Sequence, residues 1–169
     1  MTRPRMRMTL ALGHGTGARA PVPSIAGARP LDPPADREAL ARLLLDAYRG
    51  TVDDDGETET DALAAIDAFT AGEFGEVTPG WSEVVERDGR LVAATLVTTW
   101  QGVPLIAFSM TAPQARRQGL ARGGLLRAMD RLRTTGEPRL DLVVTVANEP
   151  AVRLYAQLGF VPVPVVPEP

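Results

Sequence analysis

The segment from Leu105 to Val146 constrains the fold of this 169-residue chain more than any other. A strand-like run, Leu105 to Met110, leads into the sequence Arg116-Arg117-Gln118-Gly119-Leu120-Ala121. A helix-like run follows and ends near Arg133, and a second strand-like run covers Leu140 to Val146. A strand, a helix and another strand in this order predict two parallel strands in one sheet. We therefore expect an α/β fold with a mixed sheet.

The turn at residues 116–121 has the composition of a phosphate site. The first backbone N–H groups of a helix have no partner within the helix, and the helix dipole favours negative charge there. Gly119 lets a ligand approach the backbone closely, and the small Ala121 does not obstruct it. Alternatively, Gly119 and Ala121 are ordinary packing residues at a helix start.

The segment from Asn148 to Phe160 supports the interpretation of this turn as a ligand site. It follows the strand-like run Leu140 to Val146 and has the pattern of a short helix closed by glycine. Taken together, the two elements resemble the Gcn5-related N-acetyltransferase (GNAT) superfamily. Arg116-x-x-Gly119-x-Ala121 matches its acyl-CoA pyrophosphate loop, and residues 148–160 match its later asparagine, Leu-Tyr and Gly-Phe segment. The resemblance is specific over residues 109–160, loose over 24–104 and absent before Ser24.

The resemblance implies a mixed, mostly antiparallel sheet flanked by about four helices. It also implies acetyl-CoA as the acyl donor, with the acetyl group passing directly to an amine. Ser109, Met110 and Thr111 would pair with the pantetheine through their backbone, and Asn148 would contact the same arm. The pyrophosphate loop would comprise Arg116, Arg117, Gln118, Gly119, Leu120, Ala121 and Arg122. Asn148 can also cap its helix, which does not exclude ligand contact.

Tyr155 is the candidate catalytic residue. The reference pKa of a phenol is about 10 and that of a thiol about 8.5, so a tyrosine can donate a proton to departing CoA thiolate. Alternatively, Tyr155 is a core residue at helical spacing with Ala151 and Leu158. The chain has no cysteine, which excludes a thioester-linked enzyme intermediate. The general base stays open, with Glu83, Glu86 and Asp141 considered through water.

Composition excludes several other function classes. All 18 basic residues are arginine, and the net charge is −3, which argues against a nucleic-acid-binding protein. With His14 as the single histidine and no cysteine, we expect no metal site. No apolar run is long enough to cross a membrane, so we expect no membrane partner and a cytoplasmic protein. Arg127, Arg131 and Arg133 are equally consistent with a solvated helix face.

The acidic turn at residues 53–57 is the candidate feature for the acceptor. It lies between two predicted helices, Asp36 to Tyr48 and Glu59 to Ala71, which border the acceptor site in the superfamily. Its carboxylates would attract a cationic amine, small molecule or peptide. A solvated loop is the alternative interpretation.

The two ends of the chain depart from the superfamily pattern. Members usually carry two strands after the Gly-Phe, whereas residues 161–169 leave room for one, an edge strand. We therefore divide the chain into an extension, residues 1–23, and an acetyltransferase domain, residues 24–169. Met6 to Leu12 alternates with a period of two. We expect it to supply the missing strand beside Leu140 to Val146, from the same chain or from the partner in a homodimer.

The sequence predicts an N-acetyltransferase, with a catalytically silent acyl-CoA-binding sensor or regulatory module as the main alternative. A DNA-binding arginine helix is a third interpretation, which the negative charge disfavours. The identity of the amine, the oligomeric state and the use of acyl groups larger than acetyl cannot be read from the residues.

Overall fold

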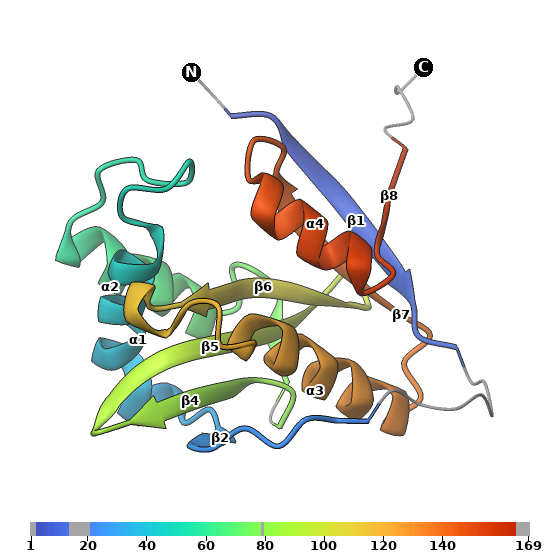
Figure 1. The fold of residues 1–169 in the computed structure, drawn as a ribbon, viewed down its shortest axis with the longest axis horizontal. Coiled ribbons are helices and arrows are strands. Elements are labelled where there is room, and N and C mark those ends of the chain that lie inside the picture. Colours follow the sequence, from blue (N-terminus) through green and yellow to red (C-terminus); the bar gives the residue numbers. More distant parts are fainter. Residues whose placement is uncertain (1–2, 14–20, 79, 165–169) are drawn as a thin grey trace.

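One open sheet runs through the whole molecule (Figure 1). The computed structural model describes residues 3–13, 21–78 and 80–164, so the predicted loop around His14 lies outside the described residues. The strands are β1 (Arg5–Ala11), β2 (Ala28–Pro30), β3 (Glu76–Val77), β4 (Glu83–Arg87), β5 (Arg90–Trp100), β6 (Val103–Thr111), β7 (Arg139–Thr145) and β8 (Val161–Pro162). The helices are α1 (Pro33–Tyr48), α2 (Glu59–Thr70), α3 (Leu120–Thr134) and α4 (Glu149–Gln157), with a 3-10 turn at Pro113–Ala115.

The order of the strands is β2-β4-β5-β6-β7-β1-β8, and β3 pairs with β5. Within the described residues, only β6 and β7 pair in parallel. The prediction of a mixed, mostly antiparallel sheet with about four helices is therefore confirmed. The predicted hairpin is also present: Asp88 and Gly89 have φ values of 50° and 72°, as the turn between β4 and β5 requires.

Helices cover both faces of the sheet because its central strands carry apolar side chains on both faces. Val97 of β5 packs with Leu125, Ala128 and Leu132 of α3. Its neighbour Leu96 packs with residues of α1 and α2. Successive side chains of a strand point to opposite faces, so α3 lies on one face of β5 and the pair α1–α2 on the other. Helix α4 joins the α3 face through Tyr155 and Leu158.

Strand β1 lies inside the sheet, between β7 and β8 (Figure 1). Leu10 is opposite Leu140 of β7, and Met8 is opposite Pro162 of β8. The alternating pattern explains the placement, because Met8 and Leu10 are buried while Arg7 and Ala11 are exposed. The predicted strand beside residues 140–146 is thus confirmed, and it comes from the same chain.

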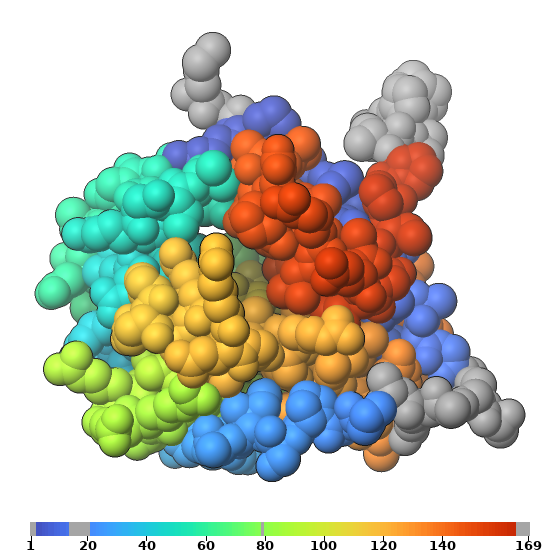
Figure 2. All heavy atoms as spheres, viewed as in Figure 1, coloured from blue at the N-terminus to red at the C-terminus, as the bar shows by residue number. Residues whose placement is uncertain are grey.

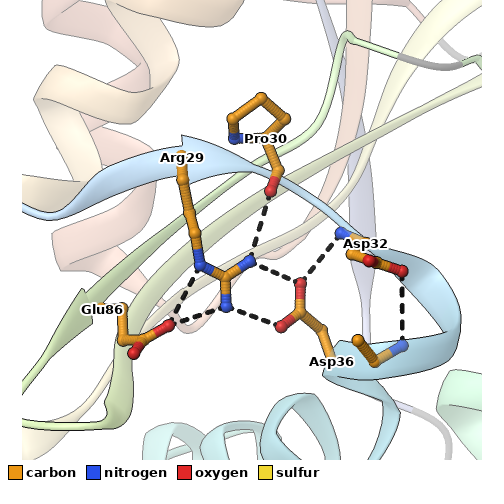
Figure 3. A network of polar contacts seen from close by, with 6 residues as sticks. Arg29, Pro30, Asp32, Asp36 and Glu86 are labelled. Carbon is orange, nitrogen blue, oxygen red and sulfur yellow. Dashed lines mark hydrogen bonds and ion pairs between the residues drawn. The ribbon is translucent and has the colours of Figure 1, made fainter.

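Arg29 fastens the start of α1 to the edge of the sheet (Figure 3). Its guanidinium donates to both carboxylate oxygens of Asp36 in α1, at 2.9 and 2.7 Å, and to Glu86 of β4, at 3.0 and 2.8 Å. Burial alone would raise the pKa of Asp36, but the hydrogen bond from Arg29 and the one from the Asp32 amide lower it. Asp36 therefore stays ionised and holds α1 in place.

The arginines of α3 have structural contacts as well. Glu83 of β4 is buried, and both Arg127 and Arg131 donate to its carboxylate. Arg133 donates to the carbonyl of Leu12, at 3.1 Å. The interpretation of these three arginines as a solvated helix face is therefore wrong: α3 uses them to hold β4 and the end of β1. Sequence pattern missed this because the partner carboxylate lies 44 residues away along the chain.

Candidate active site

The sheet opens between β6 and β7. These strands pair at two positions, Leu105 with Asp141 and Ile106 with Leu142. In the pairing with β5, the register shifts between Leu96 and Val97, which leaves Ala107 as an extra residue in β6. A bulge of this kind bends the strand that carries it. Beyond it, β6 keeps β5 on one side and has no strand on the other within the described ranges, so residues 107–111 border an open cleft.

A glycine corner follows the free end of β6. Arg117 has φ +60° and Gly119 has φ +76°, a left-handed conformation that favours glycine. Helix α3 begins directly after Gly119 without a side-chain cap, whereas Asp32, Thr58 and Asn148 cap the other three α-helices. The first amides of α3 are therefore unpaired donors. No atom lies within 4 Å of a Cβ built on Gly119, so the space above them is open.

The side chains of this corner face different ways. Arg116 donates to the carbonyl of Ala47, at 2.8 Å, and so fixes the corner to the end of α1. Gln118 accepts from Arg87 at 2.6 Å. Leu120 is buried beneath the corner, and Ala121 is half-buried. Arg117 and Arg122 are exposed and have no hydrogen bond or ion pair within the described residues, so they are the guanidinium groups available to an anion.

Two further glycines bring α3 close to the sheet. A Cβ added to Gly124 would lie 2.3 Å from Oγ1 of Thr95 in β5, and one added to Gly123 would lie 2.7 Å from Cδ1 of Ile25. The first turn of α3 therefore rests almost directly on β5. This contact sets the height of the free amides above the end of β6.

A cavity of about 750 Å³ occupies the cleft, and it is called the acceptor cavity hereafter because of the role proposed for it below. Its lining includes Leu44 and Tyr48 of α1, Phe108 and Ser109 of β6, Val144 of β7 and Tyr155 of α4. The acidic segment, residues 53–57, reaches across its mouth, where Asn148 donates to Oδ2 of Asp53 at 2.8 Å. Figure 2 shows a hollow between this segment, in teal, and α4, in orange-red.

Tyr155 stands in the cleft with its ring partly in the core. It is 9% exposed and packs edge-to-face on Phe160, with ring centroids 5.9 Å apart. Burial raises the pKa of Tyr155; the charge of Asp53 raises it further, and a hydrogen bond from Ser109 opposes the rise. Tyr48 shares the cavity, and burial likewise raises its pKa, with added contributions from Tyr155 and Asp53. Both phenols therefore keep their protons at neutral pH.

The three carboxylates considered as general bases are all engaged elsewhere. Glu83 bonds to arginines of α3, and Glu86 bonds to Arg29. Asp141 accepts from Thr9 at 2.5 Å and from Arg7. Asp53 is the carboxylate whose charge acts on both tyrosines. Sequence reasoning recognised the acidic turn but had no means of selecting this residue, because the choice depends on a contact with Asn148, 95 positions away.

The remaining predicted residues lie at the free end of β6 and the start of α4. Ser109 lines the cavity, while the side chain of Met110 is buried in the core beneath α1. Oγ1 of Thr111 is buried and has no hydrogen-bond partner within the described chain. Asn148 accepts from the amide of Ala151 at 3.3 Å, which confirms its capping role. Trp100 lines the cavity, whereas Trp81 packs on the core.

Neither a metal centre nor a membrane span emerges from the described residues. No group of three or more His, Cys, Asp or Glu side chains in them could hold a metal ion. None of their helices combines the length and the apolar character that crossing a bilayer requires.

Three solved structures illustrate the similarity in fold. A GCN5-related N-acetyltransferase from Sphaerobacter thermophilus is 19% identical to this chain, with a TM-score of 0.69. The match covers 95% of this chain and 49% of that protein. A protein assigned to the GNAT acetyltransferases from Novosphingobium aromaticivorans is 22% identical with a TM-score of 0.61, covering 95% and 60%. A GNAT family acetyltransferase from Brucella melitensis, in complex with acetyl-CoA, is 16% identical with a TM-score of 0.60, covering 84% and 89%.

The chain thus spans 49% of the length of the first protein and 60% of the length of the second. No curated protein matched it in sequence. The model of the acetyltransferase (GNAT) family matches residues 37–160, which contain most of α1, the split between β6 and β7, the uncapped glycine corner and Tyr155. On this match over most of its length, the chain belongs to the GNAT acetyltransferase family.

Proposed function

We propose that this protein transfers an acetyl group from acetyl-CoA directly to an amine. The observation that carries the proposal is the uncapped start of α3, which follows a strand whose outer edge, from Ala107 on, has no partner strand among the described residues. Diphosphate accepts hydrogen bonds from such amides and is favoured by the helix dipole. The open space above Gly119 and the unpaired Oγ1 of Thr111 fit a ligand at this place.

The donor site comprises the residues around this corner. The amides from Arg117 to Arg122, through Gln118, Gly119, Leu120 and Ala121, would hold the pyrophosphate, and the exposed guanidiniums of Arg117 and Arg122 would add charge-assisted bonds. Arg116 would contribute indirectly, by holding the corner in place, because its guanidinium donates to the carbonyl of Ala47. The free edge of Ser109, Met110 and Thr111 would bond to the pantetheine. Asn148, already beside the cleft, would contact the same arm.

The chemistry requires one proton acceptor and one proton donor. An ammonium group entering the acceptor cavity must lose a proton before it can attack, and Asp53 is placed to receive it, directly or through water. The amine then forms a C–N bond to the acetyl carbon while the C–S bond breaks. Tyr155, protonated at neutral pH, would supply the proton to sulfur, and its phenolate would recover a proton, through water, from the nitrogen as the amide forms. The chain has no cysteine to carry the acetyl group, which supports direct transfer.

Isothermal calorimetry with acetyl-CoA tests the donor site. Gly119→Ala should weaken binding at least tenfold, because the added methyl would occupy the space above the helix start. Gly136→Ala is the matched control: Gly136 also has positive φ, +84°, and open surroundings, but it lies beyond the other end of α3. Equal affinities for both variants, or no heat with the native protein, would remove the proposed donor site.

A panel of amines with detection of free thiol tests the reaction. Tyr155→Phe should lower kcat by about 10²-fold, the scale of general acid catalysis, and leave acetyl-CoA affinity within twofold. An unchanged rate would exclude Tyr155 as the proton donor. If acetyl-CoA binds and no amine releases CoA, the alternative of a silent acyl-CoA-binding module replaces the enzyme.

A further inference from the structure

The N-terminal segment that runs into β1 brings three arginines, Arg3, Arg5 and Arg7, to the acceptor side of the molecule, and two of them have partners among the described residues. Arg3 forms an ion pair with Asp55, at 2.7 Å, and Arg7 contacts Asp141. Arg5 is exposed and lines the acceptor cavity, yet it makes no hydrogen bond or ion pair within the described residues. An arginine without a partner in a cavity wall is available to a ligand.

The wall around Arg5 is positively charged. Arg7 and Arg139, which also line the cavity, share one carboxylate, that of Asp141, with Arg139 at 3.9 Å. The carboxylate of Asp141 is almost completely buried and already accepts a bond from Thr9. It therefore has little capacity left to neutralise Arg5. Since the whole chain carries a net charge of −3, this positive wall is a local feature.

The facing wall has the opposite charge. Asp53, Glu57 and Asp61 line it, and Asp53 and Glu57 act electrostatically on Tyr48 together with Arg5. Arg5, Tyr48 and Tyr155 line the same cavity, so a ligand in it can lie between the arginine and the tyrosines. A cavity with acidic groups near the tyrosines and guanidiniums on the adjoining strands matches a molecule that carries both signs of charge.

The phosphates of the acyl donor are not the anion that would bind Arg5. None of residues 116–122, which form the proposed pyrophosphate site, lines the acceptor cavity. The corner they form lies at the start of α3, whereas β1 pairs with the far side of β7. An anion beside Arg5 therefore belongs to the acceptor.

We propose that the acceptor is an amine that also carries an anionic group, and that Arg5 binds this group while the amine lies between Asp53 and Tyr155. The inference rests on the proposed function and adds the substrate class. Both carboxylate and phosphate suit a planar guanidinium. Arg5 is then the residue that distinguishes such acceptors from simple amines and diamines.

Matched pairs of acceptors test the proposal. Lysine and cadaverine differ by one carboxylate, as do 5-aminopentanoate and butylamine, and phosphoethanolamine presents phosphate instead. The native enzyme should favour the anionic member of each pair by roughly 10- to 100-fold in kcat/KM, as expected for one charge-assisted contact. Arg5→Gln should abolish the preference by raising KM for the anionic acceptors, with kcat and the kinetics of butylamine unchanged. Arg90→Gln, at the exposed first residue of β5, should behave as native.

Equal use of both members of each pair by the native enzyme would overturn the proposal, as would an Arg5→Gln variant that slows them equally. Binding gives a readout independent of turnover. Lysine or phosphoethanolamine should raise the melting temperature of the native protein but not of Arg5→Gln, even without acetyl-CoA. If acetyl-CoA does not bind, the proposed function fails. The change in melting temperature still shows whether Arg5 binds an anion.

Discussion

The side-chain amide of Asn148 donates a hydrogen bond to the carboxylate of Asp53, with nitrogen and oxygen 2.8 Å apart. One residue starts α4 and the other belongs to the acidic segment after α1, so the bond spans the cleft between two parts of the fold. The oxygen of the same Asn148 side chain caps α4. Asn148 thus orients the carboxylate that we assign as proton acceptor and, at the same time, anchors the helix that carries Tyr155.

Replacing Asp53 with Asn should lower kcat by about 10²-fold, because the amide cannot take a proton. Acetyl-CoA affinity should stay within twofold. Asp46→Asn, on the exposed side of α1, is the control for an unrelated loss of charge. Steady-state kinetics with a good acceptor measure both variants, and a native-like rate for Asp53→Asn would exclude it as the base.

The two tyrosines, which are the only ones in the chain, should resist alkaline titration. Burial raises the pKa of both Tyr48 and Tyr155 above the ordinary value of about 10. The folded state therefore holds protons that the unfolded state releases, so their contribution to stability is present below pH of about 10 and declines above it. Ultraviolet absorbance should report little tyrosinate until the protein unfolds, whereas the denatured chain titrates normally. Normal titration in the folded state would contradict this prediction.

Glu83→Gln should reduce the free energy of unfolding by about 3 kcal/mol at neutral pH, because it leaves Arg127 and Arg131 without their shared carboxylate. Burial alone would raise the pKa of Glu83, but the hydrogen bonds from these arginines lower it. The stabilisation is therefore present above the ordinary glutamate pKa of about 4.3 and is lost as the pH falls further. Urea denaturation at several pH values measures the loss.

The matched control for Glu83 is Glu86→Gln. The Glu86 side chain is 41% exposed, so its ion pair with Arg29 is screened by solvent. We therefore expect Glu86→Gln to lower the free energy of unfolding by less than about 1 kcal/mol. Equal losses for the two variants would show that burial does not distinguish the two ion pairs.

Gly124→Ala should destabilise the protein by roughly 1–3 kcal/mol, because its methyl group would overlap Thr95. It should also weaken acetyl-CoA binding, since the start of α3 must move away from β5. The double variant Gly124→Ala with Thr95→Ala should recover most of both losses. Gly123→Ala is the control, because it meets the end of the flexible Ile25 side chain. Thermal denaturation and calorimetry measure the set, and a native-like Gly124→Ala would contradict the close packing.

Local patterns predicted the elements of this fold well. The alternation of Met8 and Leu10 with polar neighbours indicated β1, and the expected pairing of this strand with residues 140–146 is confirmed. The glycine corner between β6 and α3 was likewise predicted from residues 116–121, because a left-handed turn and a helix start depend on adjacent residues.

The partners of charged side chains could not be predicted in this way. The sequence left Arg127 equally consistent with a solvated helix face, whereas it binds Glu83, and Arg116 donates to the carbonyl of Ala47. Asp53 was one carboxylate among several until its contact with Asn148 distinguished it. In each case the partner lies more than 40 residues away.

The sequence by itself determined where most of the strands and helices form, that Met6 to Leu12 pairs beside β7 and that a glycine turn precedes α3. These properties depend on periodicity and on backbone conformation within a few residues. Only the tertiary structure decided which carboxylate acts electrostatically on Tyr155, which arginines are already paired and that Arg5 has no partner in the described part of the chain. Ion pairs and pKa values depend on distances in space, and those distances exist only after the sheet has brought distant segments together.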